Sequence, residues 1–393
     1  MALRLRIIIM LSVLLLSVFH LGLQAVSGAQ NQAGAQAAQI VRSVARVTPT
    51  PGVDAGQTGP DRFAPGVNPL TGLPVSDPSS LALPPALISV ANFPVSGRPQ
   101  AGLSYAPYVY ELFIGEGMTR FLALFYGDYP QLDEASASQP SLGVDNAGIG
   151  PVRSGRLPYQ SLRKLYNGFL VMASASNEVR SELSSSTNVY GSDTEDINSA
   201  RIDVSRLQAL AQANKKDKAF NMTGNQFSLQ PPAGGQDASK LWVFYAFLNQ
   251  VLWDYDPTSQ AYLRQQDKAD GSGKFYPSTD RLTGEQLSFE NVVVMFVQHE
   301  VLNSSHTLID LDLLYTTNKA YLFRDGKVYP IYWTTANGDY EKKSGLLRPI
   351  RFVDKEGNPF PLKPGKTWVE VVDVTATIVE KEPGYWKARF YAP

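Results

Sequence analysis

The sequence predicts an α+β fold in which an N-terminal mixed α/β sheet domain is followed by a mostly antiparallel β domain. Strand-like runs alternate with helical patterns between residues 67 and 235. From residue 236 onward the apolar runs are short, rich in β-branched and aromatic residues, and separated by turn residues. The 393 residues are 44% hydrophobic and 11% aromatic, which is enough apolar material for two domains.

Residues 1–29 have the composition of an export signal. Two arginines precede the apolar run 7–19, and small residues end the segment at Ala29. The apolar stretch 7–26 is just long enough to cross a bilayer, so an uncleaved N-terminal anchor is the alternative. The protein is therefore predicted to be extracytoplasmic, either secreted or anchored to the outer face of the cytoplasmic membrane.

The chain contains no cysteine. Neither a lipid thioether anchor nor a disulfide can form, so stability must come from a packed core. The formal net charge is −1 and no basic stripe is present, so we expect no nucleic-acid partner. Membrane contact is expected only through the N-terminal segment, if it is uncleaved, and the envelope ligand or partner protein is left open.

Residues 30–66 are predicted to be a disordered linker. Gln, Ala, Gly, Thr and Pro dominate this segment, and it has no apolar periodicity. Such a composition cannot bury enough apolar surface to offset the entropy lost on ordering.

The first domain, residues 67–235, combines strands that are apolar on both faces with two amphipathic helices. The strands at 108–114 and 121–126 are therefore expected to be central and covered on both sides. The second helix has Asp203 as its candidate N-cap. The predicted strands are 87–91, 108–114, 121–126 and 169–173, and the predicted helices are 158–166 and 204–214.

The second domain, residues 236–393, is predicted from eight short strands. Asp325-Gly326 between two apolar runs is a strong hairpin signal. Trp253, Tyr255 and Arg264 are expected in the core or between the domains, with sugar stacking as a second interpretation. The strands are 241–247, 251–255, 261–264, 292–297, 320–323, 327–333, 368–372 and 386–391.

Most catalytic templates are missing from the sequence. His299-Glu300 begins like a zinc-protease helix, but Asn303 stands where the second histidine is required. No phosphate-binding glycine loop, dinucleotide fingerprint or serine-nucleophile elbow is present. We therefore predict no cofactor and no metal.

One group of residues is a candidate site for binding an anion. Glu111 lies inside an apolar strand, where a charge is costly unless it is paired. Two arginines precede the helix at 158–166, at the end of its dipole that disfavours cations. One interpretation is that Arg153 or Arg156 neutralises Glu111. The other is that the arginines capture an anionic ligand while the glutamates position it. We expect the two arginines to divide these roles, with Arg153 structural and Arg156 in contact with the ligand. The full candidate set is Glu111, Glu116, Thr119, Arg120, Arg153, Ser154 and Arg156.

Several short motifs resemble the YerB-like family, a bacterial extracytoplasmic family of unknown function with an N-terminal and a C-terminal part. The resemblance covers residues 68–372 and implies placement in the envelope, often as a lipoprotein. This chain lacks the lipidated cysteine, and Ser278 stands where relatives often have histidine. The motifs are NPLTG (68–72), RPQAGLS (98–104), YE (110–111), EGMTRF (116–121), GPVRS (150–154), NVVV (291–294), FRDGK (323–327) and PGKTW (364–368).

The sequence favours a non-enzymatic envelope protein that binds a ligand or partner through its first domain. The alternative is a cell-wall hydrolase or transferase that uses Glu111 or Glu116 with Arg153, because carboxylate enzymes need neither histidine nor cysteine. A third interpretation is a scaffold whose domains only pack against other proteins.

Overall fold

The computed structural model describes residues 58–129, 148–189, 200–215 and 220–393. The predicted export segment and residues 30–57 of the predicted linker lie outside these ranges. Among the described residues, no helix is both long enough and apolar enough to span a membrane.

The end of the predicted linker, residues 58–66, is attached to the folded body. Thr58 exchanges backbone hydrogen bonds of 2.9 and 2.8 Å with Phe227, and the ring of Phe63 packs edge-on against the Phe227 ring. The predicted disorder therefore does not extend to residues 58–66. The packing of the Phe63 ring outweighs the Pro- and Gly-rich composition around it.

The first part of the chain mixes helices with parallel and antiparallel strands, as the sequence predicts. Both predicted helices form, and Asp203 stands at the N-cap of α5 without a side-chain capping bond. The main elements are β3 (Ala86–Ala91), β4 (Tyr108–Gly115), β5 (Met118–Phe125), β6 (Gly148–Ile149), α3 (Pro158–Leu165), β7 (Phe169–Met172), α4 (Asn177–Glu182), β8 (Ser186–Asn188), β9 (Ile202–Asp203) and α5 (Val204–Ala213).

The second part is mostly antiparallel β, which confirms the predicted fold class. Asp325 and Gly326 form the tight turn with φ of 52° and 69°, the left-handed values that this type of hairpin needs. Its strands are β10 (Gln236–Asp237), β11 (Lys240–Ala246), β12 (Asn249–Asp256), β13 (Ala261–Asp267), β14 (Phe275–Pro277), β15 (Ser288–Phe289), β16 (Asn291–Val297), β17 (His299–Val301), β18 (Ile309–Leu311), β19 (Thr317–Arg324), β20 (Lys327–Thr334), β21 (Arg351–Val353), β22 (Thr367–Asp373), β23 (Thr377–Glu382) and β24 (Tyr385–Arg389), with helix α6 (Asp339–Ser344).

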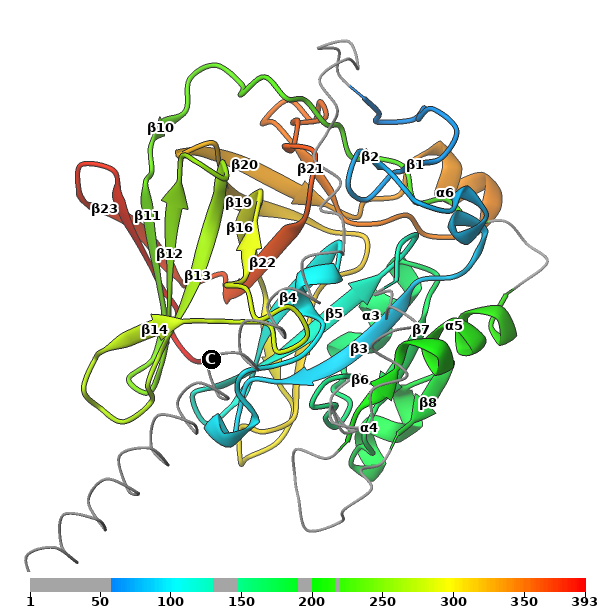
Figure 1. Cartoon of the computed structure of the whole chain (residues 1–393), viewed down its shortest axis with the longest axis horizontal. Coiled ribbons are helices and arrows are strands. Elements are labelled where there is room, and N and C mark those ends of the chain that lie inside the picture. The colour runs from blue at the N-terminus through cyan, green and yellow to red at the C-terminus, as the bar shows by residue number, and fades with distance from the viewer. Residues whose placement is uncertain (1–57, 130–147, 190–199, 216–219) are drawn as a thin grey trace, which may run out of the picture. The chain divides into compact units, whose positions relative to one another are not determined.

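The two parts share one 11-stranded sheet, here called the shared sheet (Figure 1). Its order is β10-β20-β19-β16-β22-β4-β5-β3-β7-β8, with β21 beside β20. The parts meet where β22 runs parallel to β4, in a register that places Glu370 opposite Glu111. Strands from the two sides of the predicted domain boundary are therefore hydrogen-bonded to each other. The position of that boundary, between residues 235 and 236, remains a prediction.

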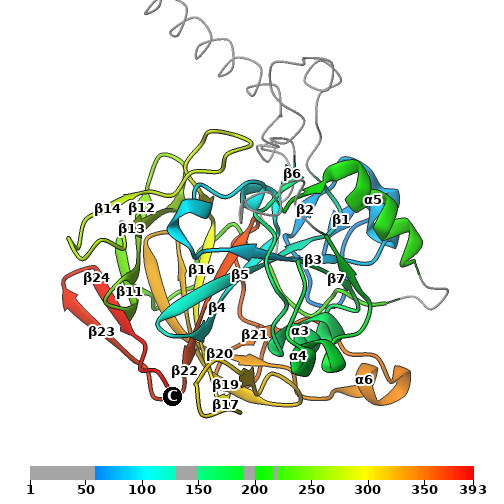
Figure 2. The same cartoon turned by 90° about the horizontal axis from the view of Figure 1, so that it is seen from below.

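A second sheet, here called the outer sheet, contains β14-β13-β12-β11-β24-β23, with β15 beside β13. Figures 1 and 2 show it to one side of the shared sheet. One apolar cluster contains side chains of both sheets, among them Phe121 and Trp368 from the shared sheet and Trp253 and Trp386 from the outer sheet. The main core thus lies between the two sheets.

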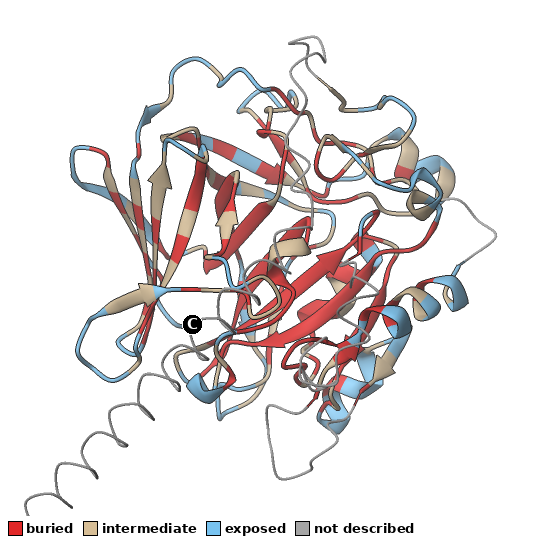
Figure 3. Ribbon diagram, in the orientation of Figure 1, coloured by how far each residue is buried: buried red, intermediate tan, exposed pale blue. Residues whose placement is uncertain are grey.

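Helix α3 covers the opposite face of the shared sheet. Tyr159, Leu162 and Leu165 pack there with Tyr110 and Leu122 of strands β4 and β5. Strands β3, β4 and β5 are buried along nearly their whole length (Figure 3), which for β4 and β5 was predicted from their two apolar faces. Any polar side chain on these strands is therefore enclosed, and the face on which it lies decides its partners.

Candidate functional site

The carboxylate of Glu111 is paired with the guanidinium of Arg264. Its Oε2 lies 2.9 Å from Nη2 of Arg264, and neither side chain is more than 2% exposed. Glu111 points from β4 into the space between the two sheets, and Arg264 reaches it from β13 of the outer sheet. The prediction that Arg153 or Arg156 neutralises Glu111 is therefore wrong, because both lie beyond the other face of the shared sheet.

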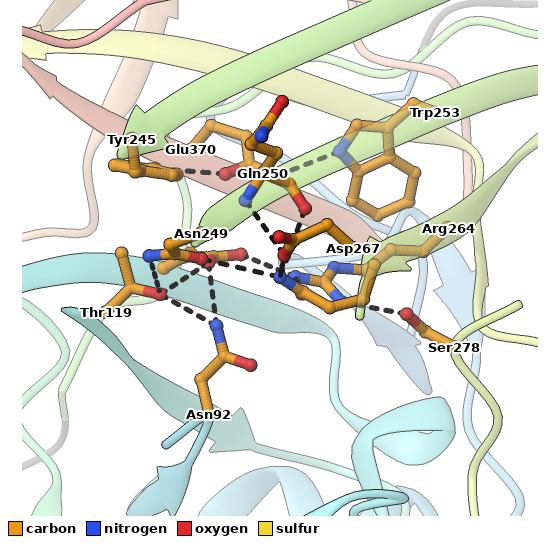
Figure 4. A network of polar contacts seen from close by, with 12 residues as sticks. Asn92, Thr119, Tyr245, Asn249, Gln250, Trp253, Arg264, Asp267, Ser278 and Glu370 are labelled. Atoms are coloured by element: carbon orange, nitrogen blue, oxygen red, sulfur yellow. Dashed lines mark hydrogen bonds and ion pairs between the residues drawn. The ribbon is translucent and has the colours of Figure 1, made fainter. Parts of the chain in front are cut away.

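Neutral polar groups complete the hydrogen bonding of this pair (Figure 4). Thr119 donates to Oε1 of Glu111 over 2.7 Å, and Asn92 donates to the same oxygen over 3.2 Å. Arg264 donates to Ser278 Oγ at 2.9 Å and to Gln266 Oε1 at 2.6 Å. Several aromatic rings enclose the guanidinium, the nearest being Trp368, whose centroid lies 4.7 Å from Cζ of Arg264. Ser278 thus belongs to this network.

A second buried carboxylate, Glu370, lies beside Glu111 on the neighbouring strand. Trp253 donates to its Oε1 over 2.8 Å and Tyr245 to its Oε2 over 3.0 Å. Burial, and next the negative charge of Glu111, raise the pKa of Glu370 to about 8. Glu370 is therefore mostly protonated at neutral pH, and Arg264 is left to balance Glu111.

Glu111 and Glu116 do not form a catalytic pair in this arrangement. Glu111 has no exposed surface, whereas Glu116 is exposed in the turn between β4 and β5. Arg153 lies beyond the opposite face of the sheet from Glu111. No substrate could reach Glu111 while also touching Arg153, so the structure does not bring together the residues of the hydrolase alternative.

The remaining candidate residues gather on the helix-covered face of the shared sheet. Arg120 extends from β5, and the segment 153–156 runs past it into α3. Arg120 donates to the carbonyl oxygen of Ser154 over 3.2 Å, and Arg156 donates to that of Gly155 over 2.9 Å. Tyr159 of α3 completes the group, with its hydroxyl 3.3 Å from Ser89 Oγ. We call Arg120, Arg153, Ser154, Arg156 and Tyr159 the arginine cluster.

Burial and repulsion make the charge of Arg120 unfavourable. This side chain is 6% exposed, and burial together with Arg156 and Arg153 lowers its pKa to about 10, against an opposing effect of Tyr159. Among the described residues, no carboxylate forms an ion pair with Arg120 or Arg156, and the Nε atoms of both are buried without a hydrogen-bond partner. Buried guanidinium groups normally have acceptors at all their donors.

The N-terminus of α3 adds to the positive potential of this cluster. No side chain caps the helix, and its first turn contains no acidic residue. The helix dipole favours an anion at this end. The first-turn N–H groups add little, because Pro158 has none and those of Tyr159 and Gln160 already donate to the carbonyl oxygens of Arg156 and Leu157. The sequence placed Arg153 and Arg156 here correctly. It also placed Thr119 and Glu111 with them, but these two residues lie on the other face.

Comparison with known proteins identifies the chain through two family models. Residues 70–229 match the N-terminal domain of the protein of unknown function DUF3048, and residues 242–369 match its C-terminal domain. The chain belongs to the DUF3048 family. A relative named "Putative lipoprotein YerB" from Bacillus subtilis (strain 168) is 26% identical over 333 residues, which are 80% of this chain and 89% of the relative.

The crystal structure of the YerB protein from Bacillus subtilis has a similar fold. The TM-score is 0.58 at 25% identity, and the match covers 78% of this chain and 97% of the YerB chain. The YerB-like resemblance predicted from the sequence is confirmed. Within the family framework, Glu111 belongs to the N-terminal DUF3048 domain and Arg264 to the C-terminal one, so the buried ion pair joins the two domains.

Proposed function

We propose that this DUF3048 protein is an extracytoplasmic, envelope-associated binding protein, without enzymatic activity, that holds an anion at the arginine cluster. The observation that carries the proposal is Arg120, a nearly buried guanidinium whose Nε has no acceptor among the described residues. A phosphate or carboxylate would supply that acceptor and relieve the repulsion from Arg156.

Placement in the envelope is supported by the name of the relative, "Putative lipoprotein YerB", and by the export-like residues 1–29. Because this chain has no cysteine, attachment would depend on an uncleaved N-terminal segment. The N-terminal residue of the mature protein, read by mass spectrometry, distinguishes an anchored from a secreted form.

Thermal unfolding with added inorganic phosphate tests the anion site. We expect phosphate to raise the Tm of the parent protein, because a ligand at about 100 times its Kd stabilises the folded state by about 2.7 kcal/mol. The shift should disappear in Arg120→Gln and in Arg156→Gln, which remove the charge but keep polar side chains. Both variants should equal or exceed the parent in Tm without phosphate, because each relieves repulsion.

Arg180→Gln is the matched control, since this exposed arginine on α4 donates to Ser174 and lies outside the cluster. Its phosphate shift should equal that of the parent. Absence of a shift in the parent, or an equal shift in all three variants, contradicts the proposal and leaves the scaffold interpretation.

A further inference from the structure

A second region of unusual chemistry lies on the outer sheet, far from the arginine cluster in the sequence. Strands β11 and β24 run parallel and alternate buried and accessible residues (Figure 3). Their buried residues pack in the core between the sheets. Their accessible residues form what we call the cationic–aromatic face: Lys240, Trp242, Phe244, Tyr385, Lys387 and Arg389.

Each cation on this face lies over the aromatic ring directly across from it. Lys240 is opposite Tyr385, Trp242 opposite Lys387, and Phe244 opposite Arg389. The cation-to-centroid distances for these three pairs are 5.7, 3.6 and 5.7 Å, which are within the range of cation–π contacts. Three successive pairs thus hold positive groups and rings in fixed alternation.

The charge of this face differs in sign from that of the whole chain. The chain has a formal net charge of −1, whereas the six residues of the face include three cations and no acid. Asp254 offsets one of the three by pairing with Lys240 at 3.3 Å. Neither Lys387 nor Arg389 forms an ion pair within the part of the chain that the structure describes. Burial lowers the pKa of Lys387, and the nearby positive charges of Arg389 and Lys381 lower it further. An anion placed here would relieve this repulsion.

We propose that the cationic–aromatic face binds a linear anionic glycan, a polymer whose sugar rings carry carboxylate or phosphate groups. Lys387 already covers one face of the Trp242 ring, so the C–H groups of a sugar ring would pack against the parts of the aromatic rings that the cations leave accessible, while the acidic groups pair with Lys387 and Arg389. Side chains on one face of a strand repeat about every 6.6–6.8 Å. A polymer with a repeating charge matches such a row better than a single compact anion does.

Binding of fluorescent polygalacturonate, followed by thermophoresis, tests this proposal. Its methyl ester keeps the rings without the charge, and inorganic polyphosphate keeps the charge without the rings. We expect both to bind the parent about tenfold more weakly than polygalacturonate. Binding should weaken by about tenfold in K387Q/R389Q and in Trp242→Ala, and it should fall as salt is raised.

The matched control is K342Q/K343Q, which removes two exposed cations of α6 and should bind as the parent does. Equal affinity for polyphosphate or single-stranded DNA would overturn the proposal in favour of charge alone. Binding only to vesicles of anionic lipid would overturn it in favour of a membrane surface. No binding of polygalacturonate, or equal losses in the control, would also overturn it. Because the arginine cluster is intact in every variant, these outcomes are independent of the phosphate test.

Discussion

At the scale of single residues, the ion pair of Glu111 and Arg264 is the most demanding feature of the core. Two charges with almost no exposed surface lose their hydration, and only close pairing with further hydrogen bonds compensates for that loss. Asn92, Thr119, Gln266 and other neutral groups supply these bonds. Because the pair connects the two DUF3048 domains, it also fixes how one sheet packs on the other.

Removal of one charge should therefore cost far more than removal of both. We expect Arg264→Ala to lower the free energy of unfolding by about 3–5 kcal/mol, because it leaves Glu111 buried without a counter-charge. Arg264→Met combined with Glu111→Gln should recover most of that loss. Urea unfolding measures both, with Arg206→Ala on the exposed side of α5 as the control. A double variant as unstable as Arg264→Ala would show that the hydrogen bonds, not the charges, dominate.

Glu370 should make stability depend on pH. The folded state holds its proton up to about pH 8, whereas the unfolded chain releases it near the ordinary value of 4.5. The folded state binds more protons between these values, so this group contributes less stability as pH rises from 4.5 to about 8. Glu370→Gln should flatten this part of the profile of unfolding free energy against pH. An unchanged slope in Glu370→Gln would show that other groups cause it.

At the scale of elements, local pattern was enough to find all but one of the described strands of four or more residues, whereas the strands of two or three residues were missed. The runs at 108–114 and 121–126 are apolar on both faces, and each forms a central strand within a few residues of the predicted ends. Strand β23 was missed because residues 377–382 are largely charged and polar; it is the edge strand beyond β24. Because both faces of this edge strand are largely exposed, it lacks the alternation of apolar and polar residues from which strands are predicted.

The partners of the candidate residues could be predicted only in part. The buried position of Glu111 and its need for a counter-charge follow from the apolar strand around it. Its partner Arg264 is 153 residues away, and nothing local links the two. The sequence feature that could have indicated Arg264 as a buried residue is the alternation of side chains along β13. It places Arg264 on the buried face with Tyr262 and Gln266. Clustering of Arg153 and Arg156 was predictable because both are adjacent to one helix end.

At the scale of the whole molecule, the shared sheet decides how independent the two domains are. Strand β22 of the C-terminal part lies between β16 and β4, so it hydrogen-bonds to both parts. The pairing from Tyr108 to Glu111 with 367–370 lies at the centre of the sheet rather than at an edge. Separation of the domains would expose two long strand edges and the aromatic core beside them, which is a large loss of buried apolar surface.

A cut between the domains should therefore leave them associated. Residues 229–235 connect the parts and are mostly exposed, so limited proteolysis should cleave there after it has cleaved the linker before residue 58. We expect the two fragments to elute together in size-exclusion chromatography of the nicked protein, because the β4–β22 pairing and the Glu111–Arg264 ion pair both survive the cut. The fragments should separate only in denaturant. If the fragments elute as two separate species in native buffer, the connecting segment itself is needed to hold the shared sheet together. If residues 229–235 resist prolonged digestion, their backbone is protected in solution.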